Sequence, residues 1–499
     1  MKKIILCAAA LLFGTMAFAQ VSGAPEAQVV APLPGTGGHM NAGQSIQNGD
    51  DNAVRVRQAG TENSVYTEQD NGSGGGGNLA RIMQTGDVQA GISAYRNAAE
   101  VLQSGDDNQS TTVQEGDLNN AYTAQGQNDD SSARNKARIQ QGIGQQAEEN
   151  HAAIEQDGND NNASTLQIYD NSDAWTRQIG DDNGSMIVQN AGPNGSDGHE
   201  AWNWQSGNGN ESSIDQRGNG ARNTAIASQI GDDNQSKQKQ TTSAGAGMTG
   251  NTGTVVQGHP GAHTIFDQLV GLSVWTDIIA DVNGDANPIG VGFGTDLYAN
   301  GAKAKQVQEG KENEADIFQF GGSVGASNYA EQHQDGAGSW GNDAGILQAY
   351  YGSGQSNYAK QYQKGEVNRA GLVQEGSAHK ALQDQRGNYN EALSYQDGEG
   401  HLLNIHQRGN TNQAHSSQQG LANRALIVQK GGNSYVLEQN SDLGPGDLSA
   451  GGNQADILQL GPYGDFDYDA IECDFEDPMN LDMNYEVPGF DLDPICPDC

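Results

Sequence analysis

The sequence has little of what apolar cores and nucleic-acid interfaces are made from. Hydrophobic residues make up 34% of its 499 residues and aromatic residues 6%, whereas a typical globular chain is roughly 45–50% apolar. Only 25 residues are Lys or Arg, against 63 Asp or Glu, so the formal net charge is −38. We therefore expect neither a conventional apolar core nor a nucleic-acid partner, because so negative a surface repels phosphate.

Long hydrophobic runs are missing after residue 19. No later stretch approaches the roughly 18 consecutive apolar residues that span a bilayer, so no transmembrane segment is expected. Residues 1–19 combine Lys2 and Lys3 with an apolar run and the small-residue ending Ala17-Phe18-Ala19. This layout predicts a secretory signal peptide and a mature chain that starts at Gln20, with residues 20–40 as an extended leader.

Amides and glycine are abundant instead. The chain contains 70 Gly, 50 Gln and 46 Asn, yet only 18% of its residues are charged. The amides recur as Asn-x5-Gln segments, whereas composition alone would produce about five such pairs. Asn begins a segment at positions 41, 52, 63, 78, 97, 108, 119, 135, 150, 161, 183, 210, 223, 234, 251, 300, 313, 328, 342, 357, 368, 390, 412, 423, 433 and 453, and Ser172, His199, His379 and His401 replace it in four others.

Residues between the two amides alternate in polarity. Asn390, Ala392 and Gln396 share one parity, whereas Glu391 and Tyr395 have the other. A period of two is typical of a β-strand with one buried and one wet face. We therefore expect Asn, Ala, an aliphatic residue and Gln to point inward from each strand.

Short turns join the closely spaced segments. Gln-x-Gly-x-x-Asn connects one strand to the next, so strand and turn together make a unit of about 11 residues, with Gly where the chain must turn. His379 and His401 replace Asn 22 residues apart, which favours two strands per rung and a stack of one His on the other. The sequence predicts an all-β fold, a β-solenoid of fifteen stacked strand-turn-strand rungs, about 70 Å long at roughly 4.8 Å per rung.

The repeat Gln-x-Gly-x-x-Asn-x-Ala-x5-Gln resembles the curlin repeat of curli fibre subunits, which are secreted bacterial functional amyloids. The resemblance implies a β-solenoid that polymerises end to end into extracellular fibres for adhesion and biofilm matrix. The structural ladder that it assigns here consists of Gln363, Asn368, Gln374, Gln385, Gly387, Asn390, Ala392, Gln396, Gln407, Gly409, Asn412, Gln418, Gly420, Asn423, Ala425 and Gln429.

The repeat defines the organisation of the chain. We expect curlin-like repeats at 41–257 and 300–461, separated by an insertion at 258–299, the most hydrophobic stretch after the signal peptide. The final segment, 462–499, is acidic and is expected to be disordered. It holds Cys473, Cys496 and Cys499, which are candidates for one disulfide with a cysteine left over.

No catalytic motif, metal-ligand set or nucleotide fingerprint stands out from the repeat, so we expect no enzyme and no cofactor. Our first functional hypothesis is a structural fibre subunit at the bacterial cell surface, with itself, related fibre subunits and an outer-membrane export apparatus as partners. The alternatives are a monomeric β-solenoid adhesin or ligand-binding rod, and a minor subunit that nucleates or caps a fibre.

Overall fold

The computed structural model describes residues 41–461, except 61, 72–75, 87–96, 128–131, 143–146, 193–196, 219–220, 243–248, 259–297, 324, 337–339, 350–353 and 440–451. These residues form 31 strands and no helix. The signal peptide, the leader, nearly all of the insertion and the tail with its three cysteines lie outside the described residues, so the expectations for them stay predictions.

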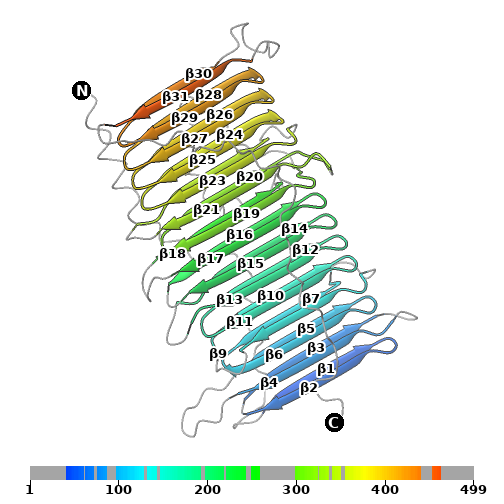
Figure 1. The fold of residues 1–499 in the computed structure, drawn as a ribbon. Coiled ribbons are helices and arrows are strands. Elements are labelled where there is room, and N and C mark those ends of the chain that lie inside the picture. The colour runs from blue at the N-terminus through cyan, green and yellow to red at the C-terminus, as the bar shows by residue number, and fades with distance from the viewer. Residues whose placement is uncertain are drawn as a thin grey trace, which may run out of the picture.

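All of the strands but one belong to two parallel sheets (Figure 1). The first sheet, called sheet A here, contains β1 (Ala42–Asn48), β3 (Ser64–Asp70), β5 (Ala98–Ser104), β7 (Asn120–Gln125), β10 (His151–Asp157), β12 (Asp173–Ile179), β14 (Glu200–Ser206), β16 (Arg222–Ile230), β18 (Thr249–Gln257), β20 (Glu314–Gln319), β22 (Asp343–Gln348), β24 (Arg369–Ser377), β26 (Glu391–Glu399), β28 (Gln413–Leu421) and β30 (Ser434–Gln439).

The facing sheet, called sheet B, contains β2 (Ala53–Ala59), β4 (Leu79–Thr85), β6 (Gln109–Asp117), β8 (Lys136–Gln141), β11 (Asn162–Ile168), β13 (Gly184–Asn190), β15 (Glu211–Gly218), β17 (Gln235–Thr242), β19 (Lys303–Gly310), β21 (Tyr329–Gly336), β23 (Tyr358–Lys364), β25 (Lys380–Arg386), β27 (Leu402–Arg408), β29 (Arg424–Lys430) and β31 (Gln454–Leu460). The short β9 (Ala147–Glu148) pairs only with β6.

The strands alternate between the sheets along the chain, so one strand of each makes a rung. Each strand pairs in parallel with the strand one rung on, and equivalent positions of the repeat lie above one another. Arg369 and Glu391, which each follow the Asn of their repeat, pair with each other, and Gln396 pairs with Gln418. The prediction of an all-β solenoid with two strands per rung is confirmed.

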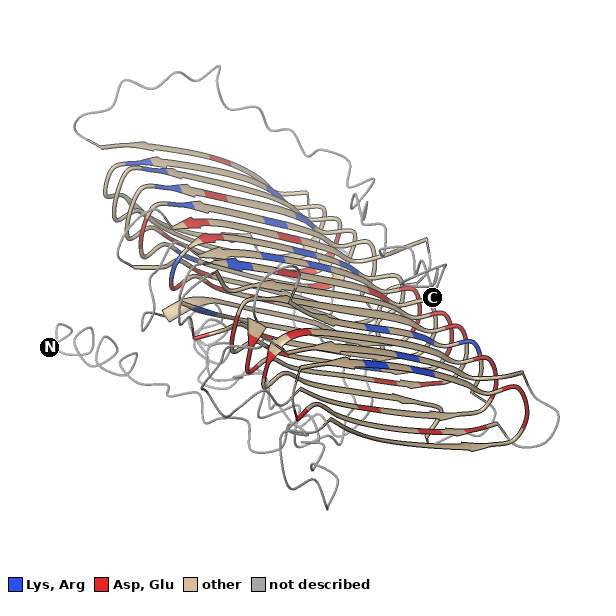
Figure 2. Cartoon of the chain, turned by 90° about the horizontal axis from the view of Figure 1, so that it is seen from below, with Lys and Arg blue, Asp and Glu red and all other residues tan. Residues whose placement is uncertain are grey.

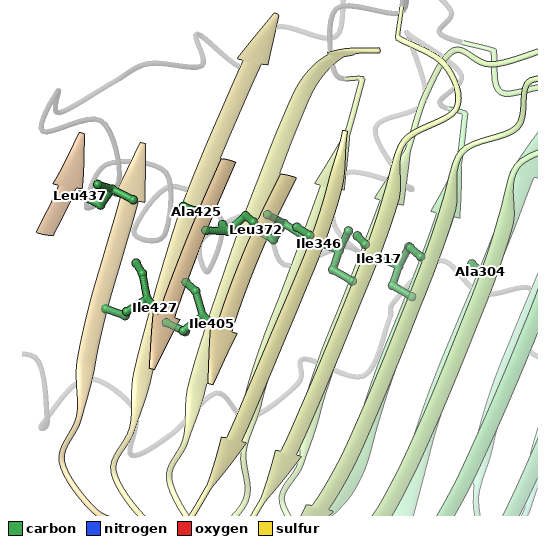
Figure 3. Packing of buried hydrophobic residues seen from close by; sticks show 14 of the residues in the cluster. Ala304, Ile317, Ile346, Leu372, Ile405, Ala425, Ile427 and Leu437 are labelled. Atoms are coloured by element: carbon green, nitrogen blue, oxygen red, sulfur yellow. The ribbon is translucent and has the colours of Figure 1, made fainter. Parts of the chain in front are cut away.

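The interior between the sheets is narrow and partly amide. Ala392, Gln396 and Asn390 are at most 1% exposed, whereas the outward Glu391 and Tyr395 are only half-buried. Small and branched aliphatic side chains fill the centre, and Figure 3 shows Ile317, Ile346 and Leu372 following one another along the stack. Because each strand is only about seven residues long, the interior needs few large apolar side chains, which explains the low hydrophobic content.

Glycine is required where the chain leaves each strand. Gly387 has a φ of 119°, and a Cβ built on it would lie 2.0 Å from the backbone oxygen of Gly409 one rung on. A side chain would therefore meet both an unfavourable backbone conformation and a clash. Stacked corners of this kind explain the Gly two residues after Gln in the repeat.

The insertion does not interrupt the Gln ladders. Gln240 donates to Gln308 on sheet B at 2.8 Å, and Gln257 donates to Gln319 on sheet A at 2.9 Å, so both sheets continue past the insertion in register. One predicted segment is wrong: Ala302, not Asn300, occupies the Asn position, because its N–H bonds to the Oδ1 of Asn234. Asn300 lies two residues earlier in the corner, where its Oδ1 accepts the N–H of Asp232.

Candidate functional site: amide ladders and the open ends

The Gln residues form one continuous ladder on each sheet. On sheet B, Gln363 donates through Nε2 to Gln385 Oε1, Gln385 to Gln407, and Gln407 to Gln429, each at 2.9 Å. On sheet A, Gln374 donates to Gln396, and Gln396 to Gln418, at 2.8 Å. Every one of these bonds has its donor on the earlier rung.

Backbone carbonyls of the opposite sheet fix the orientation of these amides. The second Nε2 hydrogen of Gln385 bonds to the backbone oxygen of Arg369 at 2.9 Å, and that of Gln407 bonds to the oxygen of Glu391 at 2.8 Å. A carbonyl can only accept, so the NH2 group of each Gln faces it. The ladders thus also tie the two sheets together.

The Asn residues form ladders that run the other way. Asn390 donates its backbone N–H and its Nδ2 to Asn368 Oδ1, at 3.1 and 3.0 Å, and Asn412 makes the same two bonds to Asn390. The donor is now on the later rung. Since a backbone N–H cannot accept, this direction is fixed too.

Three histidines replace Asn in its ladder. His379 and His401 stack with ring centroids 4.9 Å apart and planes 5° apart, as the spacing predicted. His379 Nδ1 accepts the N–H of His401, and His401 Nδ1 accepts the N–H of Asn423. Each Nε2 lies 2.7–2.8 Å from the backbone oxygen four residues earlier. In the neutral ring with hydrogen on Nε2, Nδ1 accepts the N–H of the next rung as an Asn Oδ1 does, and Nε2 donates to its own corner instead of the earlier rung.

Burial lowers the pKa of His379 to about 4 and also lowers that of His401. Protonation of Nδ1 would turn its acceptor into a donor that faces the N–H of the next rung. The neutral ring is therefore the form that the ladder requires. His199, which holds the same position in an earlier rung, has its pKa lowered to about 4 by burial as well.

A second row of Gln lies beside the first on sheet B, and the repeat pattern did not predict it. Nε2 donates to the next Oε1 from Gln238 to Gln306, Gln332, Gln361 and Gln383, at 2.8–3.1 Å. The signal in the sequence is Gln-x-Gln in five strands of the same sheet. We expected an aliphatic residue at this position.

The remaining ladder residues occupy inward positions or corners. Ala392 is fully buried and Ala425 is 7% exposed, both in the apolar cluster of the interior. Gly387, Gly409 and Gly420 have positive φ at corners of the solenoid. Asn423 donates its Nδ2 to the oxygen of Gln419, which closes the corner before its own strand.

The rod ends in open strands, β1 and β2 at one end and β30 and β31 at the other (Figure 1). At the last rung, Gln459 Oε1 accepts from Gln429, but the only bond from its Nε2 among the described residues goes to the oxygen of Ser434. At the first rung, Gln47 donates to Gln69, and its Oε1 accepts no hydrogen bond from an earlier rung among the described residues. One end therefore presents Gln donors and the other presents Gln acceptors.

The Asn ladders reverse this assignment. Asn41 Oδ1 accepts both bonds from Asn63, so its own N–H points away from the rod. Asn453 donates to Asn423, so its Oδ1 is the group left over. The two ends are complementary in both ladders, whereas two like ends would place donor against donor and acceptor against acceptor.

No family model and no curated protein matches this chain. In the ranges that the structure describes, no group of three or more His, Cys, Asp or Glu residues could hold a metal ion. Within the same ranges, no helix has the length and apolar character needed to cross a membrane.

Proposed function

We propose that this protein is a secreted structural protein, a curli-like fibre subunit that assembles end to end through β-strand stacking and serves in adhesion and biofilm matrix at a bacterial cell surface. Its chemistry is self-association, and no catalytic role is proposed. The observation that supports it most directly is the complementarity of the two rod ends.

A joint between two copies would continue both ladders without a change of register. β30 of one copy would stack on β1 of the next, with Gln439 Nε2 donating to Gln47 Oε1. β31 would stack on β2, with Gln459 donating to Gln58. Unpaired strand edges are the usual template for such addition.

The repeated contacts inside the rod give the energetic argument. Internal rungs are bonded to their neighbours by both sheets and by amide ladders of Gln and of Asn, as at Gln396 and Asn390. A terminal rung lacks one of these neighbours, so an added copy would restore the missing bonds. This relation between subunits is heterologous and does not close, so it generates filaments rather than rings.

The first experiment incubates the purified mature chain and measures thioflavin fluorescence and X-ray fibre diffraction. We expect fibres with a cross-β reflection at about 4.7–4.8 Å. A chain that remains monomeric under all conditions would contradict the proposal and favour the alternative of a monomeric adhesin rod.

A matched pair of end variants tests the direction of growth. Gln459→Glu replaces the terminal donor by an acceptor, whereas Gln47→Glu keeps an acceptor where an acceptor is needed. Each removes one internal amide bond and adds one charge. We expect elongation from preformed seeds to slow roughly tenfold or more with Gln459→Glu, as the loss of about 1.4 kcal/mol at the joint implies, and much less with Gln47→Glu. Equal rates for the two variants would contradict head-to-tail joining.

A further inference from the structure

The outer faces of the two sheets differ in charge. An outward position is one, three, five or seven residues after the inward Asn position of a strand. On sheet B these positions hold seventeen basic residues: Arg55, Arg57, Arg81, Lys136, Arg138, Arg217, Lys237, Lys239, Lys303, Lys305, Lys360, Lys364, Lys380, Arg386, Arg408, Arg424 and Lys430. They are most of the 25 basic residues of the chain, and only eight outward residues of this sheet are acidic. We call this surface the basic face.

Sheet A has the opposite balance. Its outward positions hold fourteen acidic residues: Glu68, Asp70, Glu100, Glu155, Asp157, Asp173, Glu200, Glu314, Asp316, Asp343, Glu375, Glu391, Asp397 and Glu438. Only Arg177 and Arg369 are basic there. We call this surface the acidic face. Figure 2 shows Lys and Arg as bands along the strands, whereas Asp and Glu also occupy the turns at the edge.

Side-chain contacts show that two acids of the basic face each lie between two cations. Glu331 lies between Lys305 and Lys360, at 3.0 and 3.5 Å. Asp384 contacts Arg386 and Arg408, at 3.2 and 2.8 Å. Burial opposes ionisation of both carboxyl groups, but the two lysines lower the pKa of Glu331, and His406 together with the two arginines lowers the pKa of Asp384. The potential at this face is therefore positive.

Carboxyl groups of the acidic face show the reverse. Glu314 pairs in register with Asp343, so two like charges are neighbours. Burial and this neighbour raise the pKa of Glu314 to about 7, and burial raises that of Asp343 to about 6 despite Arg369. Burial and Glu68 raise the pKa of Glu100. Glu391 is the exception, because His415 and Arg369 lower its pKa.

We infer that these rods associate side by side, with the basic face of one copy on the acidic face of a second copy. Each rod carries the basic face on one side and the acidic face on the opposite side. The same contact can therefore repeat from one rod to the next. It is distinct from end-to-end joining, because it uses outward side chains and leaves the strand edges free.

The available area is sufficient. Seven-residue strands of about 3.3 Å per residue, over fifteen rungs of about 4.8 Å, give the basic face roughly 1,600 Å². On the acidic face, outward side chains in the middle of the rod, such as Val256, Phe318 and Leu347, are at most 5% exposed. The part available for contact is therefore the strands from β1 to β14, roughly half of that area. A stable interface needs about 800 Å² per partner, so a staggered overlap of half the rod is enough. Because the contact is largely electrostatic, it should weaken as the Debye length falls from about 30 Å at 0.01 M salt to about 3 Å at 1 M.

The first test measures side-by-side association of the full chain by sedimentation velocity and fibre width by electron microscopy, from low to high salt. The variant Lys239→Glu with Lys303→Glu reverses two charges of the basic face. Its matched control, Arg134→Glu with Lys311→Glu, makes the same change of net charge at corners. We expect association at low salt that is lost at high salt, weakened roughly tenfold or more by the face variant and little by the control.

Carbodiimide cross-linking of a mixture of ¹⁴N and ¹⁵N chains identifies the partner surface. We expect mixed-isotope links between basic-face lysines such as Lys239 and acidic-face carboxylates such as Glu100. Because these links join faces and not terminal rungs, they report on side-by-side contact whether or not fibres grow end to end.

Three results would overturn the inference. One is equal weakening by the face variant and the corner control. Another is links from Lys239 or Lys303 only within one chain, to the acids of residues 465–499, which would make the tail the occupant of the basic face. The third is association that appears only when dextran sulfate is added, which would assign the basic face to a polyanion.

Discussion

Two neighbouring stretches of sheet B place different kinds of side chain at one inward position, the fourth residue after the Asn position of each strand. In β17 to β25 it holds the second row of Gln, including Gln332 and Gln361, whereas in β27 to β31 it holds Ile405, Ile427 and Ile457. The backbone register is the same in both stretches. The position therefore does not require an apolar side chain, and within each stretch it holds the same kind of side chain as the rungs above and below.

The ends of the Gln row show the cost of changing from one kind to the other. Gln238 stacks on Ile214 of the earlier rung, and its buried Oε1 has no hydrogen-bond partner among the described residues. At the other end, Gln383 donates to Ser394 Oγ at 2.9 Å, so a hydroxyl from the opposite sheet ends the row. An unpaired buried acceptor costs about 1–3 kcal/mol, so one long row is more stable than several short ones.

The largest effect is expected where a charge breaks the Gln row. Gln332→Glu removes the donor that bonds to Gln361 and to the oxygen of Asp316, and buries a carboxylate in their place. We expect a loss of about 3–5 kcal/mol in the free energy of unfolding at pH 7, measured by denaturant titration. Burial raises the pKa of the new acid in the folded state, so the loss should shrink as pH falls through that value.

The control for this change is Gln454→Glu, at an exposed outward position of β31 beside Arg424. It should alter stability by no more than about 0.5 kcal/mol. A similar loss for both variants would mean that burial in the row does not decide the effect.

The converse change places a single amide in the aliphatic row. Ile427→Gln loses apolar packing and leaves an amide without ladder partners between Ile405 and Ile457, so we expect a loss of about 2–4 kcal/mol. Changing all three Ile residues to Gln should cost less per site, because the new amides bond to one another. Equal costs per site would show that continuity of the row has no energetic value.

Acid should weaken the rungs that use His more than those that use Asn. His379 has a folded-state pKa of about 4, below the ordinary value of 6.5. The unfolded chain binds the proton first, so stability should fall as pH drops from about 6.5 to about 4. His379→Asn should flatten this part of the melting-temperature profile, whereas His151→Asn, at an outward position, should not.

The smallest effects are expected at the corners, which both stretches share. Gly387→Ala combines positive φ with a clash against Gly409, so we expect a loss of about 1–3 kcal/mol. Gly400→Ala has a φ of 71° but open space around the new Cβ, so it should cost about 1 kcal/mol. A cost at Gly400 as large as at Gly387 would mean that the clash is unimportant.

Much of the ladder could be predicted because strand periodicity fixes which side chains point inward. Asn390, Ala392 and Gln396 lie inside for that reason. Asn300 was misplaced because it stands six residues before Gln306, which belongs to the second Gln row, whereas the ladder Gln of this strand is Gln308. Only the stack shows that Asn300 bonds in the corner. Glu391 was expected to be a solvated charge, but it contacts His415 and Arg369 from neighbouring rungs, which no local pattern reveals.

The opposite charge of the two faces was also missed. Basic and acidic residues look mixed along the sequence, since consecutive strands belong to different sheets. Lys303 and Lys305 on β19 are followed by Glu314 and Asp316 on β20, and the separation appears only when alternate strands are grouped. The signal was present in the sequence, but it needed the sheet assignment.

The direction of the hydrogen bonds has a mechanical consequence. Bonds between strands and between amides all run along the rod, as from Gln396 to Gln418, so a pull on the two ends loads one rung at a time. A rung of 22 residues occupies about 4.8 Å of the rod but extends to roughly 75 Å when it is released. We therefore expect the protein to lengthen under tension in successive steps of about 70 Å, so that a matrix made from it would dissipate strain before any covalent bond was stretched.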